Sequence, residues 1–440
     1  MKKYHITTFG CQMNVHDSEV LAGILEKIGY TACASPQEAD LILLNTCCVR
    51  ENAENRLYGN IGNLKALKEE NPDCIIGVCG CMVQQPAVVE KIHQSYPQVD
   101  LVFGTHNLHE LPRLLEQIEA ERTQLYEVWD CEGEIHEGLP VKRNDPFKAW
   151  VTIMYGCNNF CSYCIVPYVR GRERSRQPND ILTEIKDLVA TGVKEVTLLG
   201  QNVNSYGKDF NGQGWNFSRL LKEIASLGIA RIRFQTSHPK DLSDELIEVI
   251  ASHQNICRHL HLPMQAGSSR ILKLMNRNYT KDSYLALAEK IKNKIPGLAL
   301  TTDIIVGFPG ETESDFQDTL DLVEKIRFDS AFTFIYSPRA GTPAAKMEDP
   351  TLEADKKRRL NQLIDIQNRI SYEKNQAFIG SLSEVLVEGV SEKNPAIWSG
   401  RNTQNKLVHF KPVPSIKPGD LAVVRITGAQ TFTLEGELLV

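Results

Sequence analysis

Three cysteines, Cys157, Cys161 and Cys164, are spaced four and three residues apart, with no fourth cysteine nearby in the chain. An iron-sulfur cluster of the cubane type has four irons and is normally held by four cysteine thiolates. A set of three therefore leaves one iron open to a ligand that is not protein. The spacing predicts a cluster that does chemistry.

Other uses of the three thiols fit less well. A structural zinc site needs a second pair of Cys or His ligands, and the next cysteine, Cys257, lies far downstream without a companion. An electron-transfer ferredoxin needs a fourth cysteine in the same run. The start of the chain is too short and polar for a signal peptide, and no apolar run reaches the roughly 18 residues of a membrane span. We therefore expect a cytoplasmic protein, not bound to a membrane, whose 12 cysteines serve metal binding or catalysis rather than disulfides.

The length and composition are those of an ordinary globular protein. The 440 residues allow about two to four domains, 42% of them are hydrophobic, and the net charge is -6. These totals do not indicate nucleic acid binding, so partners must be inferred from local patterns.

Up to about Gly104, strand patterns alternate with helix patterns, which predicts a doubly wound parallel sheet. The expected strands are Tyr4–Phe9, Leu41–Leu44, Ile75–Val78 and Leu101–Phe103, with helices at Ser18–Ile28 and around Leu57–Leu64. Cysteines follow the first three strands: Cys11, then Cys47 and Cys48, then Cys79 and Cys81. Because the carboxyl ends of parallel strands meet at one edge, we expect a second set of three converging thiols. Geometry alone does not choose between Cys47 and Cys48 or between Cys79 and Cys81. Cys33 and Cys74, away from the strand ends, are expected to be buried and inert.

The strand and helix alternation resumes after a polar segment with two prolines, Pro140 and Pro146. Six strands are expected, with helices such as Ile181–Ala190 and Ser314–Ile326 between them: Trp150–Tyr155, Glu195–Leu199, Arg231–Gln235, His259–Pro263, Leu298–Val306 and Ala331–Tyr336. Six such units predict a partial (βα)6 barrel, in which sites lie at the carboxyl ends of strands. The cysteine triplet follows the first of these strands.

A run of alternating arginines, Arg170, Arg172, Arg174 and Arg176, follows the triplet. In an extended segment they would share one face and could bind phosphates, whereas a solvated or ion-paired face is the usual fate of a charge run. We expect these four arginines to bind RNA. Beyond Gly380, short strand patterns at Ser383–Gly389, Lys406–Phe410, Leu421–Thr427 and Thr431–Leu439 predict a small all-β barrel with equal numbers of basic and acidic residues.

The motifs resemble those of a known family. The spacing C-x3-C-x2-C with Tyr163 before the last cysteine is similar to the signature of the radical S-adenosylmethionine (SAM) superfamily, in which the open iron chelates SAM. The segments Thr8–Asn14, Asn45–Glu51 and Gly80–Gln84 resemble the amino-terminal domain of the methylthiotransferases, a family whose matching cysteines, here Cys11, Cys47 and Cys81, hold an auxiliary 4Fe-4S cluster. Val83 departs from the small residue usual there, and Cys48 and Cys79 are extra thiols. The last domain resembles the TRAM domain, which binds tRNA.

The resemblance implies an α/β fold with four parts. These are an N-terminal domain at 1–125, a linker at 126–145, a radical SAM domain at 146–375 and a TRAM-like domain at 376–440. It also implies two 4Fe-4S clusters, one of them held by Cys157, Cys161 and Cys164, and SAM as cofactors. Tyr163, Gln201, Ser237 and Gln265 are expected to bind SAM; Gly200-Gln201-Asn202 occupies the place of the superfamily's Gly-Gly-Glu motif but departs from it. No catalytic residue is expected beyond the cluster ligands, and His238, His259 and His261 are expected to be structural, because hydrogen abstraction by a radical needs no general base.

Within the family, Phe9–Asn14 and Cys161–Glu173 are similar to the branch that acts on dimethylallyl-adenosine beside the anticodon of tRNA. The implied chemistry is the methylation of a sulfur on the auxiliary cluster by one SAM. A second SAM is cleaved to a 5′-deoxyadenosyl radical, which removes hydrogen from C2 of the base, and the methylthio group is attached there. The base has to leave its stack for this reaction. The expected partners are tRNA, an electron donor and proteins that supply sulfur or clusters, and we expect a monomer. Two alternatives stay open: a branch that acts on threonylcarbamoyl-adenosine or a ribosomal-protein aspartate, and a non-catalytic iron-sulfur protein that binds RNA.

Overall fold

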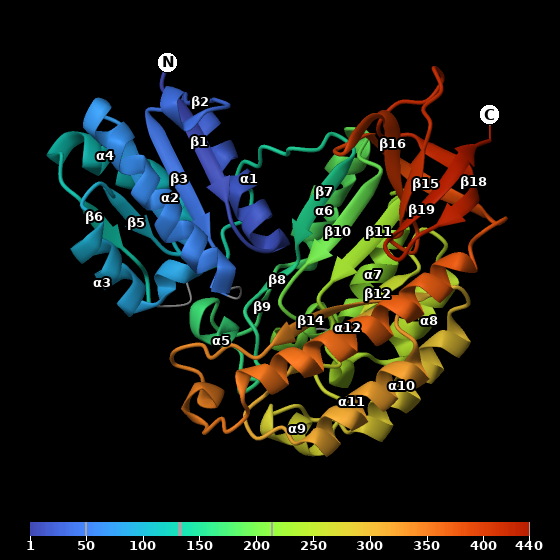
Figure 1. Cartoon of the computed structure of the whole chain (residues 1–440). Coiled ribbons are helices and arrows are strands. Elements are labelled where there is room, and N and C mark those ends of the chain that lie inside the picture. The colour runs from blue at the N-terminus through green and yellow to red at the C-terminus, as the bar shows by residue number, and fades with distance from the viewer. Residues whose placement is uncertain (49–50, 131–133, 213, 440) are drawn as a thin grey trace.

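The computed structural model describes the chain except residues 49–50, 131–133, 213 and 440, and it leaves undescribed the side chains of residues 51–54. Three units follow one another along the chain: a parallel sheet with helices, a second and larger βα unit, and a closed β-barrel (Figure 1). Val49 and Arg50 of the family motif and residues 131–133 of the expected linker lie outside the described residues.

The N-terminal unit is a six-stranded sheet in which every neighbouring pair of strands is parallel, in the order β2-β1-β3-β4-β5-β6. The strands are β1 (Lys3–Thr8), β2 (Thr31–Ala32), β3 (Leu41–Thr46), β4 (Ile75–Gly80), β5 (Leu101–Phe103) and β6 (Leu125–Glu127). The helices are α1 (Gln12–Lys27), α2 (Glu51–Glu70), α3 (Pro86–Ser95) and α4 (Leu111–Glu121), and short 3-10 turns include η1 (Pro36–Glu38), η2 (Met82–Gln84) and η3 (Leu108–Glu110).

Helices cover both faces of this sheet because successive strand residues point to opposite sides. Leu41 and Leu43 of β3 belong to the apolar core that α1 and α4 complete. Ile42 and Leu44 belong to the core on the other face, which α2 and α3 complete. The doubly wound arrangement predicted from the alternation is confirmed.

The second unit contains six strands, in two runs of three parallel strands ordered β11-β10-β7 and β12-β13-β14. Ile232 of β11 pairs in parallel with Ile256, just before β12, so the two runs adjoin. The strands are β7 (Lys148–Thr152), β10 (Glu195–Leu199), β11 (Arg231–Gln235), β12 (His259–His261), β13 (Ala299–Val306) and β14 (Ser330–Ile335). The helices are α6 (Pro178–Ala190), α7 (Phe217–Ala225), α8 (Asp244–Ser252), α9 (Ser269–Leu274), α10 (Lys281–Lys294), α11 (Glu313–Ile326) and α12 (Glu353–Gln376), with 3-10 turns η4 (Val203–Ser205), η5 (Lys208–Phe210), η6 (Pro239–Asp241) and η7 (Pro343–Lys346).

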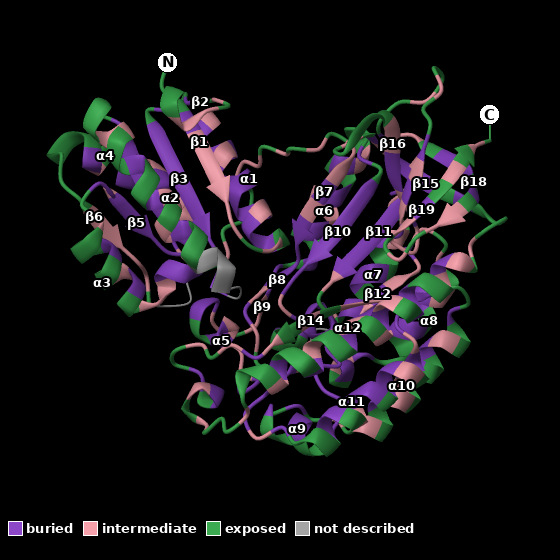
Figure 2. Ribbon diagram, in the orientation of Figure 1, coloured by how far each residue is buried: buried purple, intermediate pink, exposed green. Residues whose placement is uncertain are grey.

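One continuous apolar core joins these strands to the helices outside them. Figure 2 shows the central strands of both βα units buried and the outer faces of their helices exposed. A short helix, α5 (Val166–Val169), and a two-stranded ribbon of β8 (Met154–Tyr155) and β9 (Arg174–Ser175) follow β7 and lie on the side toward the N-terminal unit (Figure 1). The six parallel strands match the partial barrel expected from the sequence.

The C-terminal unit is a closed barrel of five strands in the order β15-β16-β17-β19-β18. Its strands are β15 (Leu382–Ser391), β16 (Asn394–Asn402), β17 (Leu407–Phe410), β18 (Leu421–Ala429) and β19 (Thr433–Leu438). β16 was not expected from the sequence. In the part of the chain that the structure describes, none of the helices is long and apolar enough to span a membrane.

Candidate metal centres and cofactor site

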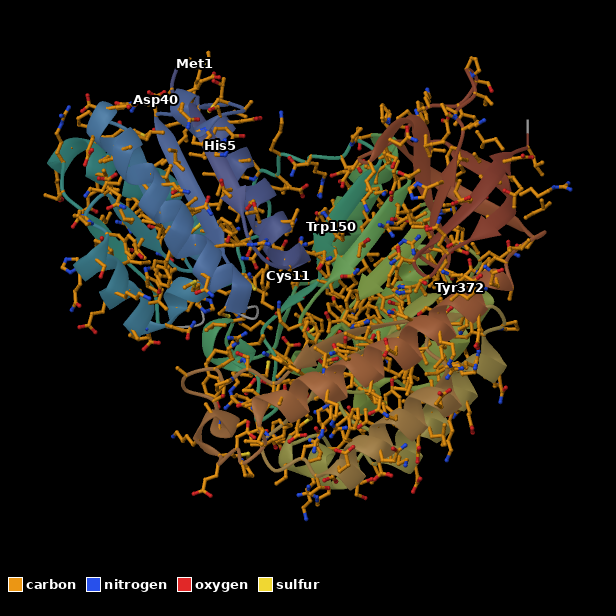
Figure 3. All side chains as sticks on the ribbon, viewed as in Figure 1. Met1, His5, Cys11, Asp40, Trp150 and Tyr372 are labelled. Carbon is orange, nitrogen blue, oxygen red and sulfur yellow. The ribbon has the colours of Figure 1, made fainter. Side chains whose placement is uncertain are left out.

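The first set of thiols lies where β1, β3 and β4 end, on the side of the N-terminal unit that faces the second βα unit. Figure 3 labels Cys11 at this position. Hydrogen bonding with Cys47 and, to a lesser degree, the positive charge of Arg170 lower the pKa of Cys11 to about 6. Cys11 and Cys81 are close enough to interact electrostatically. The structure thus brings Cys11, Cys47 and Cys81 together from three separate strand ends.

Two glycines and two asparagines hold these loops close to one another. Gly10 has φ +127°, and a side chain on it would place its Cβ 2.4 Å from the Cβ of Cys47. Gly80 has φ +98°, and a Cβ there would lie 2.5 Å from the carbonyl oxygen of Thr46. Asn14 donates a hydrogen bond to the same carbonyl at 2.7 Å, and Asn45 donates one to the carbonyl of Asn14 at 2.9 Å. The asparagines flanking the cysteines therefore fix the loops that carry the thiols.

The two extra thiols have different surroundings. Cys79 is fully buried in the apolar core beside α1 and α4, and burial raises its pKa well above the usual range of a thiol. Cys48 lies against Cys81, Ile165 and Val169. Cys79 is therefore placed as a core residue, whereas Cys48 is a neighbour of the thiol set.

The second set, Cys157, Cys161 and Cys164, occupies the loop between β8 and α5. Gly156 has φ +76°, and a Cβ there would lie 1.9 Å from the carbonyl oxygen of Arg172. Burial raises the pKa of Cys157 to about 11 and that of Cys164 to about 12, and the other thiols of the set add to both shifts. The three thiols therefore lie close together in one loop, and burial disfavours the charged forms of Cys157 and Cys164 unless a cationic ligand such as iron binds them.

Both sets fit an iron-sulfur cluster by the chemistry of their donors. Thiolates are the ligands that hold such clusters, and each set supplies three from positions fixed by backbone packing. In the described part of the chain, no three His, Cys, Asp or Glu side chains already surround a position for a single metal ion. Since a cubane takes each thiolate on a different iron, its ligands lie further apart than those of one ion.

Unpartnered polar atoms gather where β10 and β11 end. Within the described residues, Oε1 of Gln201 and Oγ of Ser237 are buried without a hydrogen-bond partner, and so are Oδ1 of Asn202 and both side-chain polar atoms of Asn204. A buried polar group left unpaired costs about 1–3 kcal/mol, so such a group is expected to meet a polar ligand. This location suits the polar groups of SAM. Asn204 was missed from the sequence, although the amide-rich run from Gln201 to Asn204 after a strand could have indicated it.

The other two residues expected to bind SAM are Tyr163 and Gln265. Tyr163, between Cys161 and Cys164, packs against the apolar cluster around Phe308, and burial raises its pKa. Gln265 has φ +68° and joins β12 to β13 by backbone hydrogen bonds with Asp303 and Ile305, each 2.8 Å long. Tyr163 lies within the second thiol set, and the SAM-binding role of both side chains stays a prediction.

The four arginines do not form a single face. Arg170 ends α5 and is buried, with its guanidinium bonded to Asp17 at 2.6 Å and to the thiol of Cys81 at 3.0 Å. Arg176 is also buried and pairs with Glu137 at 2.6 Å and Glu184 at 2.8 Å. The expected row of phosphate-binding arginines is therefore wrong for Arg170 and Arg176 in this structure, because acidic groups distant in the sequence neutralise both.

Of the other two members of the run, Arg172 is exposed and Arg174 is half-buried. Arg172 lies over the ring of Phe160 at 4.3 Å, and the half-exposed ring of Tyr168 meets Phe160 edge to face at 5.9 Å. Arg174 lies 5.9 Å from the ring of Tyr155.

His238, His259 and His261 of the second βα unit are each hydrogen-bonded within the protein. Burial and the charge of Arg277 lower the pKa of His238 to about 2, and its Nδ1 accepts from the backbone of Lys240 at 3.2 Å. Burial lowers the pKa of His259 to about 3, and both His259 and His261 bond to Thr301. These partners are those of structural histidines.

Each unit matches a family model. Residues 3–104 match the uncharacterized protein family UPF0004, residues 151–323 the radical SAM superfamily and residues 376–439 the TRAM domain. Among solved structures, the chain resembles a radical SAM methyltransferase, TsrM, from Kitasatospora setae, with a TM-score of 0.57 and 15% identity, over 78% of this chain and 77% of that one. At that identity the likeness shows the fold alone.

Curated relatives match over the full length of the chain. A tRNA-2-methylthio-N(6)-dimethylallyladenosine synthase from Acetivibrio thermocellus is 58% identical over 100% of this chain and 91% of its own length. One from Desulforamulus reducens is 56% identical over 100% of this chain and 96% of its own length.

The fold and the paired thiol sets define the class: this is a radical SAM methylthiotransferase, whose chemistry uses iron-sulfur clusters and SAM. Within that class, the chain belongs to the family of the tRNA-2-methylthio-N(6)-dimethylallyladenosine synthases.

Proposed function

We propose that this enzyme converts N6-(dimethylallyl)adenosine next to the anticodon of tRNA into its 2-methylthio derivative, with two 4Fe-4S clusters and SAM. The observation that carries the proposal is the pair of incomplete thiol sets, one in each βα unit, with α5 between them. One set of three thiolates is enough to hold a cluster that cleaves SAM. The second set would hold a separate cluster, at which the transferred sulfur can bind.

The proposed ligands are Cys11, Cys47 and Cys81 for the auxiliary cluster and Cys157, Cys161 and Cys164 for the radical cluster. When bound, the clusters supply an electron for SAM cleavage and an iron that holds the transferred sulfur. The protein binds and orients the clusters and excludes water around them. Ile165 and Val169, on the segment that leaves the radical set, pack directly against Cys81 of the auxiliary set. This apolar contact keeps the two sites adjacent.

SAM is proposed to lie at the ends of β10 and β11, where the side chains of Gln201, Asn204 and Ser237 supply unpaired polar atoms. Tyr163 and Gln265 are proposed to border the same position. The protonation of these groups does not change in the reaction, since none is a general acid or base. Their contribution is binding and orientation.

The tRNA is proposed to meet the enzyme through the exposed Arg172, the half-buried Arg174 and the TRAM barrel. Arg172 and Tyr168 flank Phe160 close to the radical set, and stacked aromatic and guanidinium groups bind unstacked bases well. The proposed domain boundaries are 1–125, 126–145, 146–375 and 376–440. An electron donor and proteins supplying sulfur or clusters are proposed partners of a cytoplasmic monomer.

The division of labour between the two sets is testable with two variants. Reduced, reconstituted Cys11→Ala is expected to form 5′-deoxyadenosine from SAM but to insert no methylthio group, whereas Cys157→Ala is expected to do neither. Equal loss of SAM cleavage in both variants would contradict the assignment. Absence of 5′-deoxyadenosine from the wild-type protein would favour a non-catalytic RNA-binding role.

A further inference from the structure

Arg170 is a buried cation at the contact between the two βα units. It follows α5, six residues after Cys164, and only 4% of its surface is exposed. Its Nη2 donates to Oδ2 of Asp17 at 2.6 Å, and its Nε donates to Sγ of Cys81 at 3.0 Å. Asp17, on α1, is also only 4% exposed. The guanidinium thus joins an acid and a thiol of the N-terminal unit to the segment that leaves the radical set.

A guanidinium remains charged even when buried, so its position must be stabilised by its partners. Asp17 neutralises it, and its Nε–H is directed at a proposed cluster ligand, Cys81. Removing one member of such a buried pair is strongly destabilising, because the other charge is left without compensation. The bond to Cys81 therefore belongs to a fixed arrangement rather than to a mobile surface side chain.

The second thiol set has an arginine of the same kind. Arg277 is 7% exposed, and its Nη1 donates to Sγ of Cys161 at 3.4 Å. Its other donors bind the hydroxyl of Tyr279 and the carbonyl of Pro263, both at 2.9 Å. Arg277 and its thiol belong to the same unit, whereas Arg170 reaches a thiol of the other unit. Only the contact of Arg170 depends on docking between the units.

Neighbouring contacts show that the segment around Arg170 is docked as a whole. Ile165 and Val169 pack with Cys48 and Cys81, and Thr105 donates a hydrogen bond to the carbonyl of Val169 at 3.2 Å. If the two units moved apart, Cys81 would lose its cationic neighbour together with this apolar cover.

We propose that Arg170 is a positioning residue that holds the auxiliary site against the radical SAM unit and raises the reduction potential of the cluster bound by Cys81. This inference rests on the two-cluster function proposed above. A reduced cluster is more negative than an oxidised one, so a cation and an N–H donor at its ligand sulfur favour the reduced state. The potential of the auxiliary cluster is thereby coupled to docking of the two units.

The test compares two variants of the full chain, Arg170→Gln/Asp17→Asn and Arg277→Gln. The first replaces the buried ion pair by two amides, which avoids leaving one charge unpaired. Each is measured in two backgrounds, one lacking the radical ligands (Cys157, Cys161 and Cys164 changed to Ala) and one lacking the auxiliary ligands (Cys11, Cys47 and Cys81 changed to Ala). The readout is a redox titration of the remaining cluster, followed by electron paramagnetic resonance.

In the Arg170→Gln/Asp17→Asn variant, the ratio of reduced to oxidised auxiliary cluster at a fixed potential is expected to fall about tenfold, which for one electron is a midpoint about 59 mV lower. The radical cluster is expected to keep its potential. Arg277→Gln should show the reverse pattern. A change below about twofold in the auxiliary cluster, or equal shifts of both clusters in both variants, would overturn the proposal.

A readout without clusters tests the docking itself. In the apo-protein, Arg170→Ala leaves Asp17 buried without its cation, so protease cleavage of the chain between the two units, residues 128–147, is expected to accelerate about tenfold. Arg122→Ala removes an exposed ion pair with Asp73 and serves as the matched control. Equal cleavage rates in these two variants would refute the docking role.

Iron analysis separates this inference from the proposed function. If the wild-type chain binds only about four irons, the two-cluster function fails. If it binds about eight irons and the potentials do not respond to Arg170, the function stands and the role of Arg170 fails.

Discussion

Ser237→Ala is expected to weaken SAM binding while leaving the apo-protein as stable as before or more stable. Ser237 is 3% exposed, and its buried hydroxyl oxygen has no hydrogen-bond partner in the described part of the chain. An unpaired buried polar group costs about 1–3 kcal/mol, and its removal relieves that cost. In a domain of about 150–250 residues, each kcal/mol corresponds to about 2–4 °C in Tm.

The same hydroxyl is proposed to bond to SAM. One hydrogen bond contributes about 0.5–1.5 kcal/mol, which corresponds to a roughly two- to twelvefold rise in the Kd of SAM. Equilibrium dialysis of SAM with the reconstituted protein measures the Kd, and thermal unfolding of the apo-protein measures the stability. The Kd of SAM should rise, while the stability of the apo-protein should rise or stay unchanged.

Ser371→Ala provides the control. Ser371 is a buried serine on α12 that donates to the carbonyl of Asp329 at 3.0 Å and accepts from Gln367 at 2.9 Å. Its loss removes two buried hydrogen bonds, although Gln367 keeps its bond to the carbonyl of Phe328, so the apo-protein is expected to lose about 1–3 kcal/mol while SAM binds as before. The reasoning would be refuted if Ser237→Ala destabilised the apo-protein as much as Ser371→Ala does, with an unchanged Kd for SAM.

Three further predictions concern other parts of the molecule. Arg231→Ala is expected to loosen the C-terminal barrel and to cost about 1–3 kcal/mol for each acceptor left without its donor, because the buried guanidinium donates to the carbonyls of Arg401 and Glu384. An unchanged resistance of the C-terminal barrel to protease would contradict this. Cys48→Ser is expected to keep about eight irons per chain, whereas Cys47→Ser should retain about four; the opposite result would exchange the ligands. Burial depresses the pKa of His238 from 6.5 to about 2, so below pH 6.5 the unfolded chain binds one more proton than the folded chain. The contribution of His238 to the free energy of unfolding is therefore fully present above pH 6.5. As the pH falls below 6.5, it is lost by up to about 1.4 kcal/mol per pH unit. His238→Gln should flatten that slope in denaturant titrations between pH 6.5 and 5; an unchanged slope would show that His238 does not cause it.

Periodicity predicted the central strands of the βα units well because these strands are short and buried throughout, whereas the exposed or half-buried edge strands β2 and β6 were missed. All six residues of β3 are buried, so the apolar run itself marks the strand. β16 was missed because it begins with Asn394, Pro395 and Ala396, all exposed, and lacks a regular apolar alternation. Its place is set by antiparallel pairing with β15 and β17, the strands before and after it in the chain, rather than by an apolar pattern of its own.

The thiol sets could be predicted because strand order places strand ends together, but the charges around them could not. The period-two spacing of the arginines suggested one extended face, yet α5 precedes Arg170 and Gly171 follows it with φ +77°. The partners of Arg170 and Arg176, which are Asp17, Glu137 and Glu184, lie on other segments. Burial of a charge is decided by such distant partners, so no local pattern reveals it.

The central claim is tested most directly by the nucleosides of a single reaction. Purified, reconstituted protein is incubated with SAM, a reductant and tRNA that carries dimethylallyl-adenosine beside the anticodon, and the tRNA is digested and analysed by mass spectrometry. The account predicts conversion of that nucleoside to its 2-methylthio derivative, together with 5′-deoxyadenosine. Formation of 5′-deoxyadenosine with the nucleoside unchanged, or methylthiolation of threonylcarbamoyl-adenosine or of a ribosomal-protein aspartate instead, would contradict it.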